Sequence, residues 1–219
     1  MKKLFLLPLL ACLSLSACGT LREAIYGREN TLAPLAAAAL GATSRDEVVR
    51  LYGAPDEVDA RRFESFQAEV YFYLDRYETG GRWQYRFLAC EFSKGVLTAY
   101  AYHEYLESGE GGFDEKERGT LDKGKSTRHD VEKRFGVPQG KALLPTTITL
   151  PALQMKLGGA PFPLAQAPEG SAEAWQYYSQ NMDDDLRKSG QKTLSVFFDA
   201  QGLYLGSALT HEAVSKSYP

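Results

Sequence analysis

The sequence predicts an α+β protein made of two tandem repeats, each a short helical segment packed on a three-stranded antiparallel meander sheet. Two observations lead to this expectation. The first is a segment that occurs twice, as SRDEVVRLYGAP at 44–55 and as TRHDVEKRFGVP at 127–138. The second is that, after each copy, apolar residues alternate with a period of two between glycine-containing turns, which indicates strands joined by hairpins.

The chain begins MKKLFLLPLLACLSLSACGT, which has the features of an export signal. Two lysines precede an apolar stretch at 4–15, which is shorter than the about 20 residues that a membrane-spanning helix needs. Leu15, Ser16 and Ala17 before Cys18 resemble the lipobox of bacterial lipoproteins, in which cleavage precedes the cysteine and the cysteine is then acylated. The alternative is an ordinary secretory signal with a cysteine near its cleavage site.

Acylation of Cys18 would hold the mature protein on a membrane almost permanently, because each buried methylene contributes about 0.8 kcal/mol. Gly19 follows the cysteine, and in the Gram-negative lipoproteins that the signal resembles this implies sorting to the outer membrane, facing the periplasm. We therefore expect a signal peptide at 1–17 and a lipidated tether at 18–30. Removal of the signal takes the net charge from −3 to about −5, which argues against nucleic acid or anionic lipid as the main ligand.

The repeated segment predicts a short capped helix in each repeat. A hydroxyl and an acidic residue three positions later form capping boxes at Ser44 and Glu47 and at Thr127 and Asp130. A glycine and then a proline follow each helix, as is typical of helix ends, and these are Gly53, Pro55, Gly136 and Pro138.

The domain boundaries follow from the repeat. Repeat 1 is expected over 31–106 and repeat 2 over 119–214, with a polar linker at 107–118 and a tail at 215–219. Trp83 in WQY is matched with Trp175 in a second WQY, and FSKG at 92–95 with FDAQG at 198–202. The first strand of repeat 2 is expected within ALLPTTITLPALQMKL, at 142–157.

Residues 119–126, GTLDKGKS, fit the phosphate-binding pattern G-x-x-x-x-G-K-[ST]. A phosphate-binding loop follows a buried strand, whereas the polar linker precedes this one. The repeat aligns GKST with GATS at 41–44, so we expect the entry to a capped helix and no bound nucleotide.

These motifs resemble the SmpA/OmlA domain of BamE-type outer-membrane lipoproteins. The resemblance is carried by the capped [ST]-[ST]-R-x-[DE]-V helix, the G-x-P end, the later Trp-x-Tyr strand and the lipobox. It covers 40–102 and, in outline, 124–210, and it implies a short helical hairpin on a three-stranded antiparallel sheet. BamE carries one such domain, whereas this chain has two. Secreted β-lactamase inhibitor proteins also have tandem helix-plus-sheet units, a likeness of architecture only.

No group of residues predicts catalysis or metal binding. His103, His129 and His211 lack the spacing of a zinc site and are expected at solvated positions. Cys90 has no adjacent histidine and is expected to be a small buried apolar residue in a strand. We expect no enzyme activity and no cofactor other than the lipid on Cys18.

Tyrosines are concentrated in repeat 1 and suggest an interaction surface. Tyr71 and Tyr73 alternate with the apolar residues Val70, Phe72 and Leu74, and Tyr77 follows in the same strand. Helices can cover only one face of a three-stranded sheet. We expect the face with these tyrosines to bind a partner, since tyrosine is enriched at interfaces. The alternative is that tyrosine simply favours half-exposed strands.

The expected function is that of a non-enzymatic, protein-binding lipoprotein on the periplasmic side of the outer membrane. The membrane contact would be the lipid anchor, and the partner an envelope protein, with the β-barrel assembly machinery implied by the family resemblance. The alternative is a two-domain inhibitor of a periplasmic hydrolase.

Overall fold

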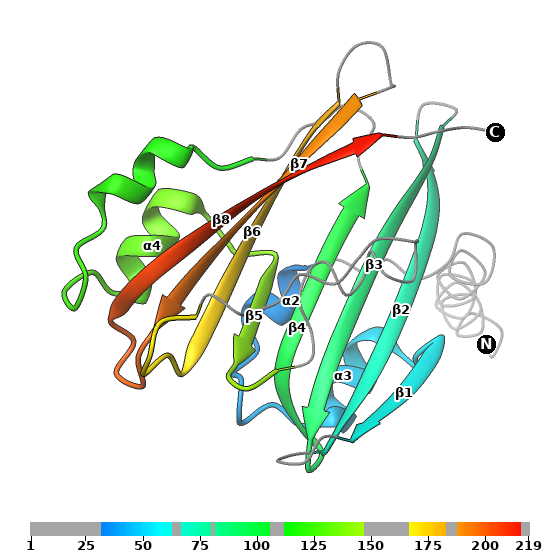
Figure 1. Ribbon diagram of the computed structural model, residues 1–219. Helices are drawn as coiled ribbons and strands as arrows, with labels where there is room; N and C mark the ends of the chain where they lie inside the picture. Colours follow the sequence, from blue (N-terminus) through cyan, green and yellow to red (C-terminus); the bar gives the residue numbers. More distant parts are fainter. Residues whose placement is uncertain are drawn as a thin grey trace, which may run out of the picture.

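The computed structural model describes residues 32–62, 67–79, 82–105, 112–146, 167–182 and 188–215. Their strands form one eight-stranded antiparallel sheet, ordered β1 to β8 both along the chain and across the sheet (Figure 1). Residues 15–18 and the rest of the predicted signal and tether lie outside the described residues. Among the helices that are described, none has the length and apolar character needed to cross a membrane.

The two halves of the sheet have the same order of elements. In the N-terminal half these are α2 (Ala33–Ala36), α3 (Arg45–Tyr52), β1 (Glu57–Arg62), β2 (Gln67–Thr79), β3 (Arg82–Ser93) and β4 (Val96–Tyr105). In the C-terminal half they are η1 (Glu115–Thr120), α4 (Arg128–Phe135), β5 (Gly140–Leu143), β6 (Glu173–Met182), β7 (Lys188–Phe198) and β8 (Tyr204–Ser215). Residues 115–118, at the end of the predicted linker, are therefore part of η1.

The prediction of two tandem units with three strands each is wrong. Each half contributes four strands, and β4 pairs with β5, so that the strands form a single sheet. The strand missed in the first half, β1, reads EVDARR, and its charges lower its apparent strand propensity. Such charges suit an edge strand, where they protect unpaired backbone groups from pairing with another chain. The strand missed in the second half, β5, has only four residues and begins before the range 142–157.

The strand pairing also corrects the alignment of the repeats. β1 and β5 each follow a helix and pair with the next strand, Val58 opposite Tyr71 and Lys141 opposite Trp175. Trp175 in β6 therefore corresponds to Tyr71 in β2. It does not correspond to Trp83, which lies in β3. The shared letters WQY misled the alignment because they occur in strands at different places in the two halves.

Both capping boxes are formed. The Ser44 hydroxyl accepts a hydrogen bond from the Glu47 amide at 3.2 Å, and Glu47 Oε2 accepts one from the Ser44 amide at 2.7 Å. Thr127 and Asp130 repeat this arrangement at 3.3 and 2.8 Å. Each helix then ends at a glycine, with φ of 76° in one and 78° in the other, a conformation that other residues adopt only with strain.

The cap of α4 is expected to contribute measurably to stability. Thr127→Ala should lower the free energy of unfolding by about 1 kcal/mol, because the amide of Asp130 loses its acceptor. Urea unfolding followed by circular dichroism measures this loss. Thr127→Ser, which retains the hydroxyl, is the control, and an equal loss in both variants would show that the cap does not contribute.

Both helices pack on the same face of the sheet and lie behind it in Figure 1. Tyr100, Lys141 and Trp175 are directly opposite one another in β4, β5 and β6, and such residues point to the same face. Tyr100 belongs to the core beneath α2 and α3, and Trp175 to the core beneath α4. We call this the helix face. The opposite one, on which no described helix packs, is called the helix-free face.

The two halves also share a core on the helix-free face. Tyr178 from β6 packs with apolar residues of β2, β3, β4 and β5, including Val70 and Ala101. Its ring meets the ring of His103 edge to face, with centroids 4.7 Å apart. Because these contacts cross the β4–β5 pairing, the halves are joined by side chains as well as by backbone hydrogen bonds.

Candidate interaction surface

The tyrosines predicted to bind a partner lie on the helix face. Tyr73 is 1% exposed, and its ring centroid lies 5.7 Å from that of Tyr52 in α3. Tyr71 is half-buried, with its ring 5.0 Å from that of Phe92. The prediction is wrong for Tyr73, because α3 covers the face that was expected to be free.

Tyr77 lies farther along β2, in a network of charged side chains. Its hydroxyl donates to Glu104 Oε1 at 2.7 Å, and Arg86 Nε donates to the same oxygen at 2.9 Å. The Arg86 guanidinium lies 4.0 Å from the Tyr77 ring centroid and also pairs with Asp75, which is 2% exposed. Burial, followed by the hydrogen bond to Glu104, raises the pKa of Tyr77 to about 12. Burial would raise the pKa of Glu104, but hydrogen bonds from Tyr77 and Arg86 outweigh it and lower this pKa. The network holds the strands together and leaves Tyr77 little freedom to bind a partner.

A different group of side chains, two exposed and two half-buried, lies on the helix-free face of β2 and β3. Leu74 is 50% exposed and lies opposite the half-buried Phe87. In the next row Arg76 lies opposite Tyr85, with the guanidinium carbon 5.9 Å from the ring centroid. The rings of Tyr85 and Phe87 are stacked, with centroids 6.3 Å apart and planes at 20°. We call Leu74, Arg76, Tyr85 and Phe87 the aromatic patch.

The composition of the aromatic patch is that of a protein–protein contact. Aromatic residues and arginine are enriched at interfaces and in the few positions that dominate binding energy. Stacked rings are already ordered, so they lose little conformational freedom when a partner covers them. Its signal in the sequence was the alternation within 85–87, which places Tyr85 and Phe87 on one face of a strand.

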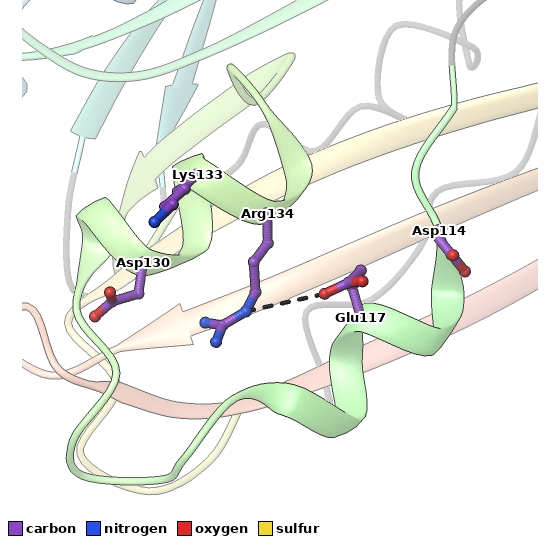
Figure 2. A pocket seen from close by; sticks show the side chains of 5 residues that line it. All are labelled: Asp114, Glu117, Asp130, Lys133 and Arg134. Atoms are coloured by element: carbon purple, nitrogen blue, oxygen red, sulfur yellow. Dashed lines mark ion pairs between the residues drawn. The ribbon is translucent and has the colours of Figure 1, made fainter.

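A shallow pocket of about 460 Å³ lies between η1 and α4 and is lined by Asp114, Glu117, Asp130, Lys133 and Arg134 (Figure 2). Arg134 Nε lies 4.0 Å from Glu117 Oε2, and the carboxylate of Asp130 is already bound to Thr127. These charges serve the packing of η1 on α4 and form no catalytic arrangement. Within the described ranges, no three His, Cys, Asp or Glu residues are grouped so that they could hold a metal ion.

The loop that fits the phosphate-binding pattern uses its amides within the chain. Gly124 N–H donates to the Tyr204 carbonyl at 2.8 Å, and the amides of Lys125 and Ser126 donate to the Asp122 carbonyl. The element before the loop is η1 and not a strand. Its amides are therefore engaged in positioning α4 on β8.

The cysteine, the histidines and the tryptophan singled out in the sequence differ in their burial and contacts. Cys90 is fully buried beneath the helices, and burial raises the pKa of its thiol. His129 and His211 are exposed as expected, but His103 is buried, which corrects the prediction for this residue. Trp175 is buried and donates its indole N–H to Glu173, which also pairs with Arg128 of α4. Trp175 therefore helps to fix α4 on the sheet.

The chain has little detectable similarity to known proteins. No family model and no curated protein matches it. Among solved structures, a Streptococcus mutans protein described as a "putative beta-lactamase inhibitor protein" matches at 12% identity, over 84% of this chain and 98% of that one, with a TM-score of 0.43. A likeness at this level transfers no function, and the resemblance to SmpA/OmlA domains stays a prediction.

Proposed function

We propose that this chain is a non-enzymatic protein-binding module of the bacterial envelope, anchored by acylated Cys18 to the outer membrane and facing the periplasm. The observation that supports binding is the aromatic patch, where Leu74 is half-exposed beside stacked aromatic rings and an arginine. The lipobox residues Leu15, Ser16 and Ala17 support the anchor. A lipid anchor would confine the sheet to the membrane surface and so raise its effective concentration for partners there.

The partner is a protein of the cell envelope, and the β-barrel assembly machinery is the one that the family resemblance implies. A photo-reactive phenylalanine in place of Tyr85 would identify it in intact cells, with the same probe at Leu51 as the control. Leu51 is also an exposed apolar residue, at 46%, but lies on α3. Cross-links to assembly components from position 85 alone support the proposal, and cross-links equal at both positions contradict it.

The patch is expected to account for most of the binding energy. Leu74→Lys should weaken capture of the cross-linked partner by about tenfold or more, because it places a charge in the centre of the contact. Leu51→Lys, a matched change at an equally exposed position, should leave capture unchanged. A quantitative pull-down of both variants, with unfolding midpoints measured in parallel, separates loss of binding from loss of fold.

An inhibitor of a periplasmic hydrolase is the second candidate function. The single continuous sheet favours an inhibitor, because both halves contribute to one helix-free face. Two separate sheets would present two separate surfaces. Titration against purified periplasmic hydrolases, β-lactamases included, would show stoichiometric loss of activity that Leu74→Lys reverses. Such inhibition would not require the lipid, so a Cys18→Ala form should inhibit equally.

A further inference from the structure

The strands β4 and β8 begin in the same way. In each, one residue exchanges two backbone hydrogen bonds of 2.8 Å with the segment before the helix, Leu97 with Gly41 and Thr43 and Tyr204 with Gly124 and Ser126. An irregularity in pairing with the preceding strand follows in both. Leu97 and Tyr204 are therefore equivalent positions, and the residues after them can be compared one by one.

The comparison shows a difference at the outer edges of the two strands. In β4, residues 99–101 pair with β5, and Tyr102 N–H donates to the Gln139 carbonyl at 2.8 Å. The equivalent residues of β8 are 206–208 and Leu209. Among the described residues no strand pairs with this side of β8, which is the last strand of the sheet.

The side chains at the two edges are also similar. β4 presents Ala99 and Ala101 to β5 on the helix-free face, opposite Ala142 and Gly140. The equivalent residues of β8 are Gly206 and Ala208, which are equally small. A strand that pairs here therefore meets the same backbone as β5 meets at β4. Beside the small Ala208 it also meets Pro168, whose Cγ lies 3.1 Å from where a Cβ on Gly206 would be.

The two edges of the sheet differ in their protection. β1 is six residues long and carries four charged side chains, a common defence of an edge against other chains. β8 is twelve residues long and reads YLGSALTHEAVS, with no proline and no lysine or arginine. On the helix face η1 contacts this strand, because Arg118 Nε donates to Ser207 Oγ at 3.3 Å. The backbone edge of β8 itself is long and lacks proline, lysine and arginine, so it is a template for pairing.

We infer that the outer edge of β8, over 206–209, accepts an extended segment of a partner protein as an antiparallel ninth strand. The segment presents small residues to Gly206 and Ala208, as β5 presents Ala142 and Gly140 to β4. A second copy that pairs through its β1 fits poorly, because β1 in the place of β5 would set Asp59 and Glu57 there. This site uses backbone pairing and lies apart from the aromatic patch, so it adds to the proposed function and does not depend on it.

The test uses the full acylated chain in detergent and a synthetic peptide, VPQGKALL, with the sequence of residues 137–144. Hydrogen–deuterium exchange over 204–211 should slow by at least about threefold at saturating peptide, because the outward N–H groups of Ser207 and Leu209 become hydrogen-bonded. The control peptide VPQEKELL replaces the two small residues with glutamate and should have no effect.

Two matched variants make the test specific. Ala208→Lys places a charge at the edge and should abolish the slowing, whereas Ser195→Lys should preserve it, because Ser195 lies opposite Ala208 one strand farther from the edge. Ser207→Pro, which removes an outward N–H, should also abolish it and provides a second readout if Ala208→Lys unfolds.

Equal slowing by both peptides, or none by either, overturns the inference. Slowing that rises with protein concentration without peptide replaces the partner with a second copy and overturns it as well. No residue of the aromatic patch is changed, so a failure here is distinct from a failure of the proposed function.

Discussion

Tyr73→Ala is expected to lower the free energy of unfolding by about 3–5 kcal/mol, the range found when a large buried aromatic side chain is removed. Tyr73 is 1% exposed in the core beneath α3, where its neighbours include Tyr52 and Leu88. Alanine leaves a cavity that these side chains fill only in part, and α3 loses much of the surface on which it packs. Urea unfolding followed by circular dichroism gives the change in free energy.

Leu74→Ala is the matched control, because Leu74 is the next residue in the same strand but points to the helix-free face and is 50% exposed. It should cost less than about 1 kcal/mol, as exposed substitutions usually do. A larger loss for Leu74→Ala than for Tyr73→Ala would mean that the helices cover the other face of the sheet. The face that carries Tyr71 and Tyr73 would then be free of helices and available to a partner.

The features that the sequence predicted correctly are local. A capping box needs only a hydroxyl and an acidic residue three positions apart, so Ser44 and Thr127 could be assigned from spacing alone. The joining of the two halves was not predictable in this way. It depends on β4 pairing with the four residues of β5, which are about 40 positions later and have no strong strand pattern of their own.

The face of the sheet that binds the helices was also beyond the sequence pattern. Alternation in β2 separates Tyr71 and Tyr73 from Val70 and Phe72, but both sets are large and apolar enough to form a core. The structure buries members of both sets, Tyr73 beneath α3 and Val70 with Tyr178 across the junction of the halves. With two apolar faces, periodicity alone cannot identify the surface left for a partner.

The pH dependence of stability is expected to show a large contribution from His103. Burial lowers the pKa of His103 from 6.5 to about 4, against the opposing effect of the Glu104 charge. Between pH 6.5 and pH 4 the unfolded chain therefore binds a proton at His103 while the folded chain does not. The contribution of neutral His103 to the free energy of unfolding is fully present above pH 6.5 and is lost as the pH decreases. Integrated to pH 4, this loss is about 3 kcal/mol.

His103→Phe isolates that contribution, because phenylalanine can keep the edge-to-face contact with Tyr178 but does not titrate. The difference in unfolding free energy between the variant and the wild type should change by about 3 kcal/mol in favour of the variant from pH 7.5 to pH 4. Other groups, Glu104 included, titrate in both proteins and largely cancel in this comparison. A difference that stays constant with pH would mean that His103 titrates as it does in water. The contact with Tyr178 would then not be closed to solvent, and the two halves would be joined more loosely than the single sheet requires.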